Sequence, residues 1–196
     1  MKRLILLMAG LLTTGTVFSQ AIDDRAVIPV SITLNSILRL NVTSGGNIEF
    51  NFNTLEDFQN GLNEGAVSAA YQTSFTVASS VNWNVNMYAE DATLLGTDIA
   101  GAPRTLALNN IGYSVASATG AQAITDFNAP SAAAVVALTN APATVLVGYS
   151  TIPNAGDIIR NSFVVHWRAG TSEGNMNGAS ILSQGVAADR SEERRV

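Results

Sequence analysis

The sequence predicts an all-β protein, built as an antiparallel sandwich or barrel of about eight strands. Three observations support this: apolar and polar residues alternate in many short segments, no segment sustains a helical period, and turn-forming residues separate the alternating segments. Successive side chains of a strand point to opposite faces, so each segment has one buried and one solvated face. Strands of this kind pair antiparallel, and this many in one domain predict a sandwich or barrel.

Three segments alternate most clearly. Residues 81–88 carry apolar side chains at odd positions and three asparagines and a tyrosine at even ones. Residues 47–53 set isoleucine and two phenylalanines against asparagines and a glutamate. Residues 162–168 set Phe163, Val165 and Trp167 on one face. We expect a strand in each.

Further strands are predicted where shorter runs show the same alternation. Pro29 has no N–H to donate, so its strand is expected at an edge or to begin there. The segments are 28–34, 38–42, 75–77, 111–115 and 145–149, with turns at 44–47, 95–97, 109–110 and 153–156.

Two short helices are also candidates. In residues 54–58, Thr54 is a suitable N-cap and Asp57 follows three residues later. Residues 131–138 follow Pro130 and form the second candidate. The rest of the alanine-rich stretch 119–144 is expected to be a long surface connection.

Residues 1–20 have the organisation of a secretory signal peptide. Lys2 and Arg3 precede an apolar run over residues 4–12, and cleavage fits after Ser19 or after Ala21. The run is too short to span a bilayer, and no later segment approaches that length. We expect an exported protein in the periplasm, outside the cell or at its surface, not an integral helical membrane protein, with one domain over residues 21–188.

The composition excludes several function classes. The chain has no cysteine, so disulfides, thiolate catalysis and zinc–cysteine sites are excluded. Its only lysine is Lys2, and after residue 20 eight arginines face 15 acidic residues, a net charge of −7. Such a surface is a poor partner for nucleic acid or anionic lipid.

Residues 189–196 form a highly charged C-terminal tail. It is either a solvated end or a sign that the domain lacks its closing strand, which a partner would then supply. An unclosed sheet presents free N–H and C=O groups that a strand of another chain can pair.

No motif indicates catalysis. The sole histidine, His166, is expected mid-strand, and no G-x-S-x-G elbow is present. Carboxylates occur in adjacent pairs, which point apart in a strand, and none fits a calcium-loop motif. Calcium bound in the loop from Glu90 to Asp98 is the one metal alternative. We expect no enzyme activity, no cofactor and no resident metal.

Asparagines at alternating positions are the most distinctive feature, because asparagine is disfavoured in strands. Their amides could pack against a neighbouring subunit, solubilise the sheet or bind sugar hydroxyls, so glycan binding is the alternative function. The candidate interaction face consists of Asn82, Asn84, Asn86, Tyr88, Asn47 and Asn51.

Segments 28–34, 48–52 and 161–168, and the leader ending at residues 18–21, carry a resemblance. In pattern the chain resembles small exported β-sandwich proteins of Bacteroidota and, more distantly, pilin-like and spore-coat-U-like subunits of chaperone–usher fibres. The resemblance implies an Ig-like sandwich that assembles on the cell surface, with self-association or other surface proteins as partners.

Overall fold

A computed structural model describes residues 31–63, 69–96, 105–149, 151–185 and 191–192. The chain divides into two units, Met1–Leu34 and Asn35–Val196. Of the first unit only residues 31–34 are described, and they form neither helix nor strand. The predicted leader and residues 28–30 lie outside the described residues.

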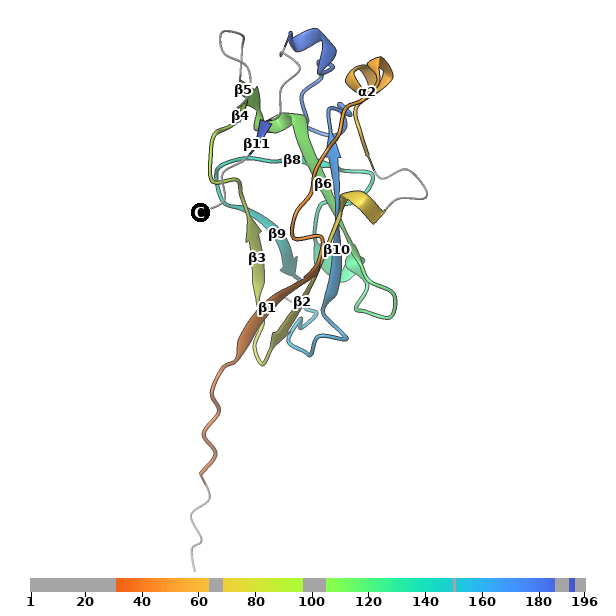
Figure 1. Cartoon of the computed structure of the whole chain (residues 1–196). Coiled ribbons are helices and arrows are strands. Elements are labelled where there is room, and N and C mark those ends of the chain that lie inside the picture. The colour runs from red at the N-terminus through yellow and green to blue at the C-terminus, as the bar shows by residue number, and fades with distance from the viewer. Residues whose placement is uncertain (1–30, 64–68, 97–104, 150, 186–190, 193–196) are drawn as a thin grey trace, which may run out of the picture. The chain divides into compact units, whose positions relative to one another are not determined.

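A five-stranded antiparallel sheet organises the second unit (Figure 1). The strand order is β1-β2-β10-β6-β8, so β1 lies at one edge. The two longest strands, β2 and β10, occupy its interior and follow the alternation seen in the sequence. The bounds are β1 Leu38–Ser44, β2 Gln72–Ser79, β6 Ile111–Ser117, β8 Val136–Ala137 and β10 Ser162–Ala169.

Two three-stranded antiparallel sheets complete the strands. One has the order β3-β9-β7, with β3 Asn84–Met87, β7 Phe127–Asn128 and β9 Ala143–Gly148. The other has the order β11-β4-β5, with β4 Thr93–Gly96, β5 Thr105–Ala107 and β11 Ser191–Glu192. Part of the predicted charged tail is therefore paired as a short strand. The all-β prediction is confirmed, whereas Ig-like topology stays a prediction.

The main hydrophobic core joins side chains of two sheets. Phe163 from β10 is fully buried and makes ring contacts with Phe75, Trp83 and Phe127. The centroid distances are between 5.2 and 5.8 Å, in the range of favourable aromatic pairs. The core is therefore built where the five-stranded sheet faces the segment around β3, β7 and β9. Its remaining buried members are Val77, Tyr113, Val115, Val145, Leu146 and Val165.

Buried asparagine closes one end of this core. Asn154 exchanges hydrogen bonds with the backbone of Trp83: the Trp83 N–H donates to Oδ1 at 3.1 Å, and Nδ2 donates to the Trp83 carbonyl at 2.7 Å. The Trp83 indole N–H donates to the Asn154 carbonyl at 2.7 Å, and Asn161 Nδ2 donates to the same carbonyl at 3.0 Å. These bonds satisfy polar groups that would be costly to bury unpaired.

The strand predicted at 47–53 is wrong. These residues have no regular secondary structure, although the alternation of exposed asparagines with half-buried apolar side chains persists. Aromatic contacts take the place of a partner strand: Phe50 stacks on Tyr71 at 4.6 Å, and Phe52 lies 5.3 Å from Phe58. Phe50 and Phe52 are thus packed by tertiary contacts, although their segment forms no hydrogen-bonded ladder with another strand.

One predicted helix is confirmed and the other is wrong. Helix α2, Leu55–Asn60, begins with a capping box between Thr54 and Asp57. Residues 131–138 instead contain a turn and strand β8, which pairs with β6. The stretch 119–144 is also more than a surface connection, because Phe127 belongs to the core. Short 3₁₀ helices span η1 Ala69–Tyr71, η2 Leu108–Asn110, η3 Ile124–Asp126 and η4 Leu182–Gln184.

Candidate interaction edge at β1

Strand β1 presents an apolar row that the core leaves uncovered. Leu38, Leu40 and Val42 pair across to Ser79, Val77 and Phe75 of β2. Directly opposite residues share a face of the sheet, so this row points to the core side. Yet the exposed fraction is 64% for Leu38, 52% for Leu40 and 49% for Val42. No residue of β1 is among the described members of the core. We call these three residues the β1 apolar row.

The backbone of the β1 apolar row faces the free edge. The Ser80 N–H donates to the Ile37 carbonyl at 3.0 Å, which turns the polar groups of Ile37 toward β2. In an antiparallel ladder the direction alternates from residue to residue. The N–H and C=O groups of Leu38, Leu40 and Val42 therefore point outward, where a further strand can pair with them.

The C-terminal end of β1 is held in place by a turn. Gly45 has a φ of +65°, and a Cβ there would collide with the Gln72 carbonyl oxygen. The Thr73 hydroxyl donates to the Gly45 carbonyl at 2.6 Å and accepts from the Trp167 indole N–H at 2.9 Å. Through Thr73, hydrogen bonds thus link the turn after β1 to Trp167 of interior strand β10.

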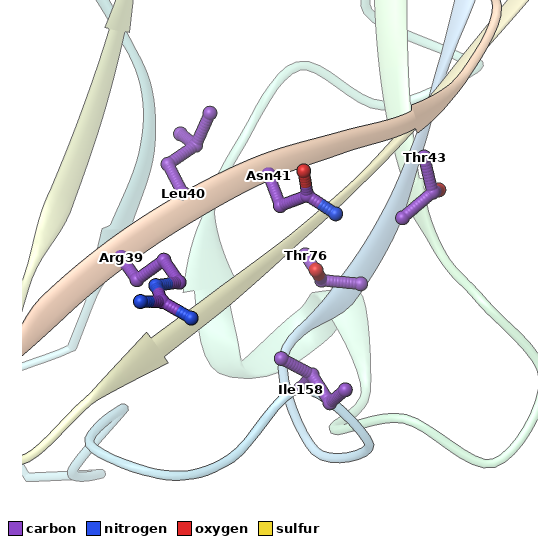
Figure 2. Close-up of a pocket in the computed structure, with 6 residues that line it drawn as sticks. All are labelled: Arg39, Leu40, Asn41, Thr43, Thr76 and Ile158. Carbon is purple, nitrogen blue, oxygen red and sulfur yellow. The ribbon is translucent and has the colours of Figure 1, made fainter.

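The opposite face of β1 is polar. Figure 2 shows Arg39 and Leu40 directed to opposite sides of the strand. Arg39, Asn41 and Thr43 line an open hollow of about 590 Å³ together with Leu40, Thr76 and Ile158. The hollow has both polar and apolar lining residues, and Arg39 is the only charged residue within β1. The edge therefore has an apolar side and a hydrophilic side, as a strand pairing in water requires.

The residues that precede β1 are also apolar and exposed. Residues 31–37 form neither helix nor strand. Ile32 is 80% exposed and Leu34 is 89% exposed. Together with the β1 apolar row they form a run of exposed apolar side chains. Such runs are unusual for a monomeric domain and commonly mark an interaction site.

The predicted asparagine face is divided by the fold. Asn84 and Asn86 are exposed on β3, an edge strand of its sheet, and Tyr88 follows it with 57% exposure. Asn82 is exposed too, but its Oδ1 accepts from the Asn154 N–H at 3.1 Å. Asn47 and Asn51 are exposed in the segment without regular structure. The six residues therefore do not share one sheet face.

Among the residues that the structure describes, the catalytic and metal candidates do not come together in one site. His166 lies mid-strand on β10, opposite Ser114 and Gln72. Arg168, on the same face, donates from one nitrogen to both carboxylate oxygens of Glu173 at 2.7 Å. Within the described ranges no three histidine or acidic residues lie close enough to hold a metal ion. Asp98, part of the calcium alternative, lies outside them.

The functional significance of β1 was missed by sequence reasoning, which predicted the strand at 38–42 without its exposure. Alternation predicts that one face is buried but does not identify the element that buries it. The available signal was an apolar row running through two consecutive predicted strands, 28–34 and 38–42, without a strong turn between them.

Over the part of the chain that is described, no helix is long and apolar enough to cross a membrane. No protein-family model matches the sequence, and no curated protein matches it significantly.

Proposed function

We propose that this protein is an exported structural or adhesive component of the cell surface that acts by associating with further copies of itself. The β1 apolar row carries the proposal. Its side chains are about half exposed, its backbone groups face a free edge, and its neighbours on β2 are buried. The assembly is either a closed oligomer or an extracellular fibre, and the direction of pairing at β1 decides between the two.

The energetics favour pairing at this edge. Covering the exposed half of each of three aliphatic side chains contributes about 1 kcal/mol per side chain. The N–H and C=O groups at the edge gain partners in the same step. Proteins usually protect such edges with charged side chains, proline or a covering loop, whereas β1 contains no proline and has Arg39 as its single charge.

The test is a pair of substitutions on opposite faces of the strand. Leu40→Glu places a charge in the β1 apolar row, and Asn41→Glu places the same charge on the hydrophilic face. We expect the leader-free wild-type protein to self-associate in light scattering and to form filaments or oligomers in negative-stain microscopy. Leu40→Glu should abolish this, Asn41→Glu should retain it, and both should remain folded by circular dichroism. A wild-type protein that stays monomeric at high concentration contradicts the proposal.

Glycan binding is the second candidate function. It is favoured by the exposure of Tyr88 beside Asn84 and Asn86 at the β3 edge, since sugar sites combine an aromatic ring with amides. Tyr88→Ala should then remove binding on a glycan array while leaving self-association intact. An array without hits for the wild-type protein rejects this candidate.

A further inference from the structure

The apolar positions of β1 continue a longer series. Counting back from Val42, the even-numbered residues are apolar as far as Ile28, with Ser36 as the single exception. Residues 31–37 are exposed and outside any strand, so the described part of this series has no partner ladder. We name residues 31–34 the N-terminal arm.

The N-terminal arm and β1 are complementary when two copies run antiparallel about Ser36. In that register Leu34 of one copy lies opposite Leu38 of the other, and Ile32 lies opposite Leu40. Two members of the β1 apolar row, Leu38 and Leu40, thus each meet an aliphatic residue, and cross-strand pairs of this kind stabilise a sheet.

The hydrogen-bond directions select the same register. Backbone groups of even-numbered residues in β1 face the free edge, so an antiparallel partner must also present even-numbered residues there. Arg39 would lie opposite Thr33, so no two like charges meet.

We infer that the basic assembly unit is a two-fold dimer in which the N-terminal arm of each copy pairs antiparallel with β1 of the other. The inference rests on the proposed self-association and specifies its geometry. When the arm of one copy pairs with β1 of the second, the two-fold symmetry brings the arm of the second copy onto β1 of the first. Both edges are therefore filled in one step, and the interface is closed, as in most homo-oligomers.

A parallel alternative is distinguishable. Shifting the arm by ten residues in parallel would also match apolar with apolar residues, and it would produce an open head-to-tail chain instead of a dimer. Parallel pairing is slightly less stable per residue, and every ladder among the described strands is antiparallel. We therefore expect the two-fold arrangement.

Cysteine cross-linking tests the register directly, because the chain has no cysteine of its own. At the two-fold axis Ser36 faces Ser36 of the second copy, with Cα atoms about 5.5 Å apart, within disulfide range. Ser36→Cys in the leader-free chain should give a covalent dimer on mild oxidation. Thr33→Cys is the matched control, because its two copies would lie roughly 20 Å apart and should stay uncoupled.

Mixed oxidation completes the test. Thr33→Cys mixed with Arg39→Cys should give a heterodimer, as the two-fold register requires. Coupling of Thr33→Cys with Thr43→Cys, together with a ladder of higher oligomers, would overturn the dimer in favour of the parallel chain and leave self-association standing. Association without coupling at Ser36→Cys would also overturn the dimer. A monomeric wild-type protein would remove both proposals.

Discussion

Leu40 and Val77 lie directly opposite each other on β1 and β2 and share a face of the sheet, yet Leu40 is 52% exposed and Val77 is 1% exposed. The hydrophobic core therefore ends between two adjacent strands. This boundary separates residues that stabilise the monomer from residues available to a partner.

Because of this boundary, truncating Val77 and truncating Leu40 should lower the free energy of unfolding by different amounts. Val77→Ala removes methyl groups from a packed core and should lower the free energy of unfolding by about 2 kcal/mol. Leu40→Ala removes more atoms but from a half-exposed side chain, and it should cost less than about 1 kcal/mol. Urea unfolding under monomeric conditions measures both. Equal losses would show that the core extends over β1.

The Asn154 hydrogen bonds predict a large polar contribution. Asn154→Ala removes both side-chain bonds to the Trp83 backbone and leaves buried groups unpaired, at a cost of about 2–4 kcal/mol. Asn82→Ala loses one bond from an exposed side chain and should cost about 1 kcal/mol or less. Chemical denaturation gives both values, and tryptophan fluorescence follows the local packing. A neutral Asn154→Ala would contradict this account.

The turn after β1 provides a third pair. Gly45→Ala should destabilise the fold by roughly 1–3 kcal/mol, because its φ is +65° and its new methyl group would meet the Gln72 carbonyl. Gly46→Ala meets nothing within 4 Å and should be neutral. Thermal unfolding of the two variants provides the comparison. The prediction fails if Gly46→Ala is the more damaging change.

Helix α2 should weaken in acid. Hydrogen bonds from the backbone of Asn53 and then Thr54 lower the pKa of Asp57 below its usual 3.8. Because the folded pKa is the lower one, this stabilisation is complete above pH 3.8 and is lost as the pH falls through the folded pKa. An NMR titration of the Asp57 carboxyl should show the depressed value. Asp57→Asn should remove this acid dependence of α2.

Neighbouring strands that each bury one face in the core were predictable from the sequence. The alternation in residues 162–168 and 111–115 matches β10 and β6, whose opposed residues Val165 and Val115 are both buried. The capping pattern of Thr54 was equally local, and the helix begins where expected. In these places local preference and tertiary packing agree.

Elsewhere long-range packing decided the structure. Phe50 and Phe52 alternate as a strand should, but they pack against Tyr71 and Phe58 without a ladder. Strands β7 and β8 have two residues each, too few to show a period. Asn154 lay in a predicted turn, and nothing local indicated that it would be buried against Trp83.

The uncovered β1 edge also affects how the protein can be produced. An edge strand of seven residues with an exposed apolar row and a single charge is a template for amyloid-like aggregation whenever copies meet before folding is complete. Protein expressed without residues 1–20 at high level in the cytoplasm should therefore accumulate in inclusion bodies, whereas Leu40→Glu should shift it to the soluble fraction. Solubility during expression becomes a rapid first measure of how exposed this edge is.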